Sequence, residues 1–164
     1  MTAALPYFAY GSDMRSVEIE KLVGRPLEAR RARLRGFRLA FTASSIEWSG
    51  GVADIVRDEE GEVEGVLFDL NAADALRMGV DQGFSEGLRR RRRVKVEAED
   101  GEEVEAVTLE VRAKSARVAP SPAYLDAMVE GASERALSES YVTYLLTLYP
   151  DEGPHWVRRA GEEE

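Results

Sequence analysis

The sequence contains no cysteine and a single histidine. Without thiols the chain can form no disulfide, no thiolate metal site and no cysteine nucleophile, and a reducing, cytoplasmic setting is consistent with this composition. The histidine, His155, stands between Pro154 and Trp156 near the end of the chain. It offers no scope for a His-rich metal site or an obvious serine–histidine pair, so we expect it to be structural and expect no metal site.

Long apolar runs and excess positive charge are also missing. No stretch approaches the roughly 18 apolar residues that span a bilayer, and the N-terminus has no basic segment followed by an apolar one. We therefore expect a soluble protein with no membrane partner. The net charge of -9 would repel phosphate groups, which makes nucleic acid an unfavourable partner.

The composition is otherwise that of a folded domain. The 164 residues are 44% hydrophobic and 32% charged, which is enough for one buried core and leaves little room for a second. We predict a single domain over residues 1–160, followed by a disordered acidic tail at 161–164.

The first half of the chain predicts mainly strands. Residues 5–10 form an apolar run typical of a strand buried on both faces, and residues 35–42 alternate as a half-buried strand does. The apolar runs 52–56 and 63–70 are separated by the charged stretch 57–62, so we expect them to pair as a hairpin. Between the first two strands, a short helix is expected from Met14 until Gly24 and Pro26 stop it.

The second half predicts a further hairpin and two helices. A short helix over 71–78 is expected to lead into a loop that contains Gly79, Gly83 and Gly87. Residues 94–98 and 104–111 flank Asp100-Gly101, which is a strong turn signal.

The two C-terminal helices have clear start signals. Ser121 with Pro122 begins the first, and Ser138 begins the second, which carries Tyr141, Tyr144, Leu145 and Leu148 on one stripe before Pro150. Five or six strands before a helical end predict an α+β domain on a curved or closed sheet.

Four segments occur in an order that identifies a family. They are Tyr7-Phe8-Ala9-Tyr10-Gly11-Ser12, the run from Trp48 to Ile55, the run from Val63 to Phe68, and the run from Pro120 to Leu125. Together they resemble the γ-glutamylcyclotransferase (AIG2-like) family over about residues 7–150. The resemblance implies a compact mixed β-barrel of about five to seven strands flanked by helices, with one cavity for a γ-glutamyl amine.

The chemistry implied by the resemblance is an intramolecular cyclisation. The α-amine of the substrate attacks its own γ-carbonyl, which releases 5-oxoproline and the free amine, so no protein nucleophile, metal or cofactor is needed. The reaction does need an oxyanion site, a hold on the α-carboxylate and a group that moves a proton. The turn at Tyr10-Gly11-Ser12 can offer backbone N–H donors, and the helix that follows favours negative charge.

By the same resemblance, several residues bind the small-molecule γ-glutamyl or related carboxylate ligand. They are Tyr7, Phe8, Ala9, Tyr10, Gly11, Ser12 and Tyr124. The alternative for the tyrosines is packing in the core with a satisfied hydroxyl.

The sequence departs from the family where the proton carrier is expected. The family has a glutamate followed by glycine, a second glycine four residues later and then a tyrosine, and this pattern falls on Gln82, Gly83, Gly87 and Arg89. A glutamine amide cannot carry a proton between two nitrogens at neutral pH. Loss of the acid/base group costs about 10²- to 10⁴-fold in rate. The family's usual asparagine after Gly-Ser is here Asp13.

Several carboxylates could replace the missing glutamate. Asp13, Asp81 or Glu86 could carry the proton with a pKa raised by burial, and Glu86 would be the family glutamate if the loop were shifted by four residues. Asp13 has a simpler explanation as the N-cap of the helix at Met14. Within the arginine run 89–93, Arg89 could reach the cavity and bind a carboxylate while the others face solvent.

Three functions remain open from the sequence. The first is a γ-glutamylcyclotransferase-like enzyme, and the second is a catalytically impaired homologue that binds a small carboxylate-bearing ligand. The third is a structural or protein-interaction domain whose cavity has collapsed. The sequence predicts no particular oligomeric state.

Overall fold

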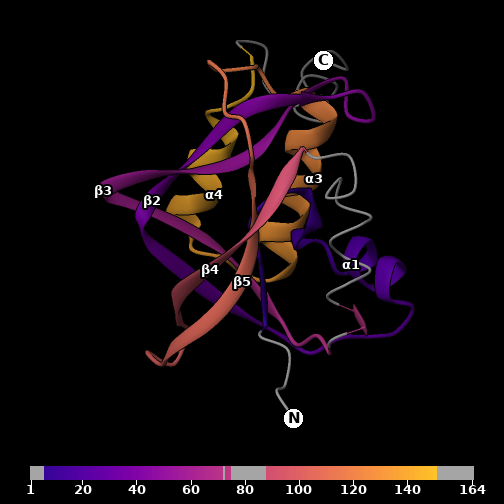
Figure 1. The fold of residues 1–164 in the computed structure, drawn as a ribbon, viewed down its shortest axis with the longest axis vertical. Coiled ribbons are helices and arrows are strands. Elements are labelled where there is room, and N and C mark those ends of the chain that lie inside the picture. Colours follow the sequence, from indigo (N-terminus) through magenta and orange to yellow (C-terminus); the bar gives the residue numbers. More distant parts are fainter. Residues whose placement is uncertain (1–5, 72, 75–87, 151–164) are drawn as a thin grey trace, which may run out of the picture.

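A computed structural model describes residues 6–71, 73–74 and 88–150 of the chain (Figure 1). The strands are β1 (Tyr7–Ala9), β2 (Ala29–Ser45), β3 (Gly50–Phe68), β4 (Arg89–Ala98) and β5 (Glu103–Val111). The helices are the 3-10 turn η1 (Ser12–Met14), α1 (Ser16–Val23), α3 (Pro122–Glu134) and α4 (Glu139–Leu146).

The strands close into a barrel in the order β1-β3-β2-β4-β5. Neighbouring strands are antiparallel except for β5 and β1, which run parallel where Tyr7 pairs with Val107. This pairing of β1 with β5 is short, and the Thr108 hydroxyl strengthens it by donating a hydrogen bond to the Phe8 carbonyl at 2.7 Å. The predicted α+β fold with a mixed barrel and flanking helices is confirmed.

β2 and β3 are longer than predicted, and the hairpin expected between 52–56 and 63–70 is wrong. Residues 52–56 and 63–68 lie on the single strand β3, which pairs antiparallel with β2 from Ser45↔Gly50 to Ala29↔Phe68. The charged stretch 57–62 stays extended because β2 is long enough to pair with it. Register shifts accompany the bends of β2, and one of them includes Gly36, whose φ of +86° suits glycine.

The remaining local predictions agree better with the structure. β4 and β5 form the predicted hairpin about Gly101, whose φ is +88°. Ser121 caps α3 by accepting from the Tyr124 N–H, and Ser138 caps α4 by accepting from the Tyr141 N–H, both at 3.2 Å. The helix expected over 71–78 and the glycine loop after it lie mostly outside the described residues.

The helix α3 lies close to the turn that follows β1. A Cβ added to Gly131 would be 2.7 Å from the Met14 Cβ, so only glycine allows this contact between α3 and η1. The segment from Tyr10 to Met14 is thereby held between the barrel and α3. No helix in the described part of the chain has the length and apolarity to cross a membrane.

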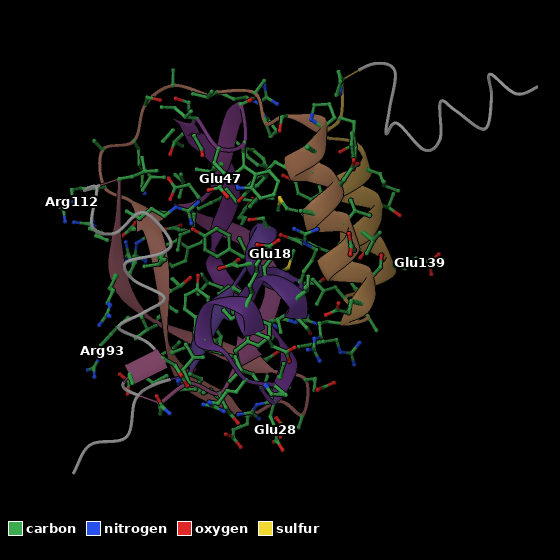
Figure 2. The ribbon with its side chains drawn as sticks, turned by 90° about the vertical axis from the view of Figure 1, so that its right-hand side faces the viewer. Glu18, Glu28, Glu47, Arg93, Arg112 and Glu139 are labelled. Atoms are coloured by element: carbon green, nitrogen blue, oxygen red, sulfur yellow. The ribbon has the colours of Figure 1, made fainter. Side chains whose placement is uncertain are left out.

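Charged side chains surround this core. Figure 2 shows Arg93, Arg112 and Glu139 pointing outward from the ribbon. Aromatic and aliphatic side chains fill the interior, including Phe8, Phe68, Ile55 and Leu125, all of them less than 2% exposed.

Candidate active site

The turn after β1 approaches α3 so closely that one of its positions has no room for a side chain. A Cβ added to Gly11 would lie 2.5 Å from the Tyr124 hydroxyl oxygen and 3.3 Å from the Ala53 Cβ. The Gly11 carbonyl accepts from the Met14 N–H at 3.1 Å, which closes the turn. Glycine is needed here because the Tyr124 hydroxyl occupies the space above the backbone.

The Tyr124 hydroxyl is held by two backbone donors. Its oxygen accepts from the Ala53 N–H at 3.0 Å and from the Ser12 N–H at 3.4 Å. The two donors come from β3 and from the turn after β1, which lie far apart in the sequence. An oxygen that accepts two hydrogen bonds becomes a stronger donor through its own O–H, because such bonds polarise one another.

Packing fixes the ring of Tyr124 as well. Its ring stands edge-on to Trp48 at 5.1 Å between centroids and edge-on to Phe41 at 6.4 Å. The side chain is only 2% exposed. The phenol therefore has one well-defined position at the end of β1.

Asp13 places a buried carboxylate beside this turn. One of its oxygens accepts from the Tyr7 hydroxyl at 2.5 Å, and the other accepts from the Gly11 N–H at 3.3 Å. Burial raises the pKa of Asp13, although the hydrogen bond from Tyr7 and the charge of Arg89 oppose that effect. A raised pKa makes this carboxyl group a better proton acceptor than an ordinary aspartate.

The predicted role of Asp13 as a helix N-cap is wrong. Asp13 lies inside η1, and the N-cap of α1 is Arg15, which makes no capping bond through its side chain. The Asp13 carboxylate instead accepts from Tyr7 and Gly11, which precede it in the chain. The local pattern favoured a cap, but the neighbouring strand β1 supplies the stronger partner.

Arg89 brings a buried positive charge to the same place. Its side chain donates to the Ala53 carbonyl at 3.2 Å, and the residue is 8% exposed. Burial alone would lower the pKa of Arg89, but the nearby Tyr124, Tyr10, Tyr7 and Asp13 together raise it, so the guanidinium stays charged. No carboxylate among the described residues lies within ion-pair distance of it. A buried cation that no carboxylate in this described part of the chain neutralises favours an anionic ligand.

The remaining predicted binding residues occupy the wall of the barrel. The Tyr10 hydroxyl donates to the Leu109 carbonyl at 2.5 Å, and burial raises the pKa of both Tyr7 and Tyr10. Phe8 is fully buried, and its ring would be 2.8 Å from a Cβ added to Gly65. Ala9 is fully buried too, so Phe8 and Ala9 lie in the core beside the turn. Their roles in binding stay predictions.

Two residues of β3 that the sequence analysis did not single out complete the arrangement. Ala53 uses its N–H for Tyr124 and its carbonyl for Arg89. The next residue, Asp54, is fully buried and accepts from the Thr42 hydroxyl at 2.6 Å, from the Val111 N–H at 2.9 Å and from the Lys114 ammonium at 3.0 Å. In the sequence, the sign of this network was the single aspartate, Asp54, within the otherwise apolar run 52–56.

The structure thus brings together Tyr7, Tyr10, Gly11, Ser12, Asp13, Arg89 and Tyr124. Within the turn that was predicted to offer N–H donors, the Gly11 N–H already donates to Asp13 and the Ser12 N–H already donates to Tyr124. The Tyr124 hydroxyl, which accepts from the Ser12 N–H, is therefore the group at this turn that can donate a hydrogen bond to a ligand. The predicted residues Asp81, Gln82 and Glu86 lie outside the described residues.

Comparison with known proteins gives one consistent result. Residues 62–145 match the model of the AIG2-like family. The γ-glutamylcyclotransferase of Mus musculus is 30% identical over 151 residues, which cover 89% of this chain and 79% of the mouse protein. The Homo sapiens enzyme of the same name is also 30% identical over 151 residues, with the same coverage. A solved structure titled γ-glutamyl cyclotransferase superposes with a TM-score of 0.82 at 28% identity, and the match covers 92% of this chain and 90% of that one.

Proposed function

Because this chain belongs to the γ-glutamylcyclotransferase (AIG2-like) family, we propose that it cyclises a γ-glutamyl amine to 5-oxoproline and the free amine. The observation that carries the proposal is the convergence of the Ser12 and Ala53 N–H groups on the Tyr124 hydroxyl, beside the buried Asp13 carboxylate. Family membership supports the reaction class, and this geometry supports the roles of individual residues.

In the proposed mechanism, the α-amine of the substrate attacks its own γ-carbonyl carbon. The new C–N bond closes a five-membered ring, and the carbonyl oxygen becomes an oxyanion. The Tyr124 hydroxyl donates to that oxygen, and its own position is held by the Ser12 and Ala53 N–H groups. A donor fixed before the reaction stabilises the developing charge without reorganisation.

Asp13 carries the proton in this mechanism. The attacking amine loses a proton to the Asp13 carboxylate, which then delivers it to the leaving nitrogen as the old C–N bond breaks. Burial of Asp13 and its raised pKa suit both halves of this transfer. The Tyr7 hydroxyl orients the carboxylate through its 2.5 Å hydrogen bond.

Arg89 binds the α-carboxylate of the substrate in this proposal. Its guanidinium is buried beside Ala53, and no described carboxylate pairs with it. A guanidinium can bind a carboxylate through two parallel hydrogen bonds, which would hold the amine in line with the γ-carbonyl. The family has a tyrosine at this position, so the cation is a feature of this chain.

The direct test is incubation of the purified protein with a panel of γ-glutamyl amines, followed by detection of 5-oxoproline by mass spectrometry. Release of 5-oxoproline above the buffer control, abolished in the Tyr124→Phe variant, is the expected result. If no member of the panel is turned over although ligands bind, cyclisation is not the function.

A second function, binding without turnover, is favoured by Gln82 at the position of the family's glutamate. The two functions differ in how they respond to Gln82→Glu. A binding protein that kept its pocket gains cyclotransferase activity from this change, because the proton carrier is restored. An enzyme that uses Asp13 is already active before the change and loses that activity on Asp13→Asn.

A further inference from the structure

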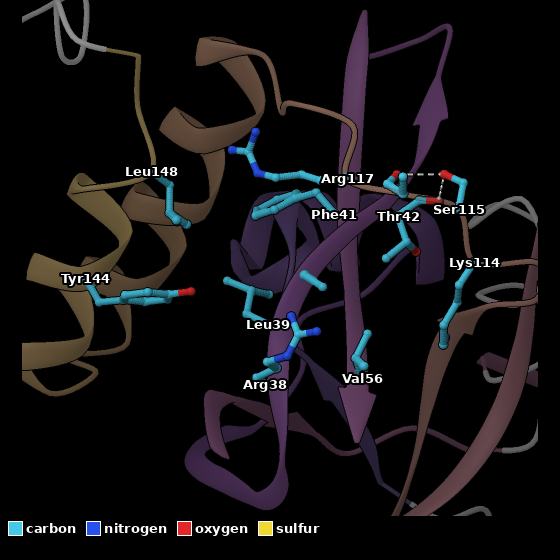
Figure 3. Close-up of a pocket in the computed structure, with 12 residues that line it drawn as sticks. Arg38, Leu39, Phe41, Thr42, Val56, Lys114, Ser115, Arg117, Tyr144 and Leu148 are labelled. Carbon is cyan, nitrogen blue, oxygen red and sulfur yellow. Dashed lines mark hydrogen bonds between the residues drawn. The ribbon is translucent and has the colours of Figure 1, made fainter. Parts of the chain in front are cut away.

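A groove runs between β2 and the C-terminal helix α4 (Figure 3). None of the residues that act in the proposed cyclisation line it, although Phe41 in its wall packs against the Tyr124 ring. The volume of the groove is about 430 Å³. Leu39 and Phe41 of β2 line one wall, and Tyr144 and Leu148 line the other. Pockets of a few hundred Å³ with apolar walls are typical of small-molecule sites.

The groove exists because α4 does not bury its whole apolar stripe. The spacing of Tyr141, Tyr144, Leu145 and Leu148 predicted one buried face. Tyr141 and Leu145 are 7% and 0% exposed, but Tyr144 is 42% exposed. In Figure 3 the Tyr144 ring points across the groove toward Leu39. An exposed aromatic side chain facing an apolar wall leaves surface for a ligand to cover.

Two guanidinium groups along this groove form no ion pair with any residue that the structure describes. Arg38 and Arg117 both line it and both are exposed. No carboxylate among the described residues lies within ion-pair distance of either, whereas Arg31 and Arg35 of the same strand β2 pair with Glu99 and Glu97.

The third cation of the groove is already neutralised. The Lys114 ammonium lies 3.0 Å from the Asp54 carboxylate and 3.2 Å from that of Glu110. In a chain with a net charge of -9, uncompensated arginines beside an apolar surface are a local exception. The groove is therefore complementary to a molecule with an apolar body and a negative group.

We propose that this groove is a binding site for a small amphipathic anion, namely a carboxylate or sulfonate on an aliphatic or aromatic body. The apolar body lies between the wall of Leu39 and Phe41 and the wall of Tyr144 and Leu148. The anionic group lies against Arg38 or Arg117. This site is independent of the proposed cyclisation, and either proposal can fail without the other.

The test uses the full chain and the fluorescent probe anilinonaphthalene sulfonate, whose emission rises in apolar surroundings. Phenylnaphthylamine is the matched neutral probe, because it has the same rings without the sulfonate. We expect the anionic probe to bind more tightly and octanoate to displace it, while octanol at the same concentration does not.

Amino-acid substitutions test whether the probes bind in this groove. Each of Arg38→Gln and Arg117→Gln is expected to weaken binding of the anionic probe by about 1.5- to 5-fold, the range for an exposed charge pair, and to leave binding of the neutral probe unchanged. Arg112→Gln is the control, because it removes the same charge from an exposed arginine that points outward elsewhere (Figure 2). Tyr144→Ser is expected to weaken both probes.

Three results would overturn the proposal. Equal binding of the two probes would mean that the arginines contribute nothing. An equal effect of Arg112→Gln would mean that only the overall charge matters. Sedimentation analysis gives the third: if the protein self-associates and only the dissociated form binds the probe, a second copy covers the groove.

Discussion

Replacement of Asp13 by asparagine separates proton transfer from every other contribution of this residue. Asparagine has the same size, and its amide oxygen can accept one of the two bonds now donated by Tyr7 and Gly11. The amide nitrogen can donate to the Tyr7 oxygen, because a phenol both donates and accepts. The geometry of the turn is therefore kept while the ability to exchange a proton is lost.

The expected change in stability is small. One imperfect hydrogen bond costs about 1 kcal/mol, and removal of a buried charge offsets part of that cost. For a protein of this size, about 1 kcal/mol corresponds to ~2–4 °C in Tm. Since folded domains are stable by about 5–15 kcal/mol, this variant remains almost fully folded.

The stability difference also has a predicted pH dependence. Burial raises the pKa of Asp13 in the folded protein, so the folded state holds this proton more tightly than the unfolded chain does. The stabilisation from the protonated form is complete below the unfolded pKa of about 3.9 and is lost as pH rises through the folded pKa. The Asp13→Asn variant should therefore gain stability relative to the native protein as pH rises from acidic to neutral.

The expected change in activity is large. Loss of a general acid/base lowers kcat/KM by about 10²- to 10⁴-fold, which unfolding cannot explain in a variant that melts normally. The native pH–rate profile should rise as the Asp13 carboxyl deprotonates, and this limb should vanish in the variant. The assay is 5-oxoproline release across pH, with melting curves under the same conditions.

Asp126→Asn is the matched control. Asp126 on α3 accepts from the Tyr149 hydroxyl at 2.6 Å, so the variant alters the same type of tyrosine–aspartate bond outside the proposed site. It should change kcat/KM less than twofold. If Asp13→Asn keeps more than a tenth of native activity, or if both variants lose activity alike, Asp13 is not the proton carrier.

Three further predictions follow from the same contacts. Gly11→Ala places a methyl group 2.5 Å from the Tyr124 oxygen and should cost about 1–3 kcal/mol by urea unfolding. Combining it with Tyr124→Phe should recover part of that loss; additive effects would contradict the close contact. Arg89→Met should weaken binding of γ-glutamylalanine about 10- to 100-fold in calorimetry, the loss expected for hydrogen bonds to a charged group. The exposed control Arg93→Met should not, and equal affinities would remove Arg89 from the site. Lys114→Met leaves the buried Asp54 carboxylate without its cation and should lower unfolding stability by about 2 kcal/mol, discounted for the partial exposure of Lys114. An unchanged urea midpoint would show that Thr42 and Val111 satisfy Asp54 alone.

Local signals in the sequence were sufficient where the interaction itself is local. Ser121 and Ser138 begin their helices as predicted because a cap acts within three residues. Asp100-Gly101 makes its turn for the same reason, since glycine accepts a positive φ. The hairpin expected between 52–56 and 63–70 failed because pairing with β2, a strand of seventeen residues, outweighs a run of charged residues that resembles a turn.

The candidate site likewise combines residues that the sequence could identify with contacts that it could not. Tyr7 to Ser12 and Tyr124 could be named from the sequence, because the motifs that contain them carry the family resemblance. What Asp13 does could not be predicted, since its partner Tyr7 lies on a strand that other strands position. Ala53 has no polar side chain, so its N–H and carbonyl contacts with Tyr124 and Arg89 leave no sign in the residue type.

The sequence by itself determined the α+β class, the starts of the two C-terminal helices, the turn at Asp100-Gly101 and the motifs that carry the family resemblance. Only the tertiary structure decided which donors meet which acceptors. Closure of the barrel brings β1 and β3 together, and α3 then places the Tyr124 hydroxyl over Gly11. The physical reason is that a backbone hydrogen bond between distant segments depends on where the chain lies in space and is nearly independent of side-chain identity.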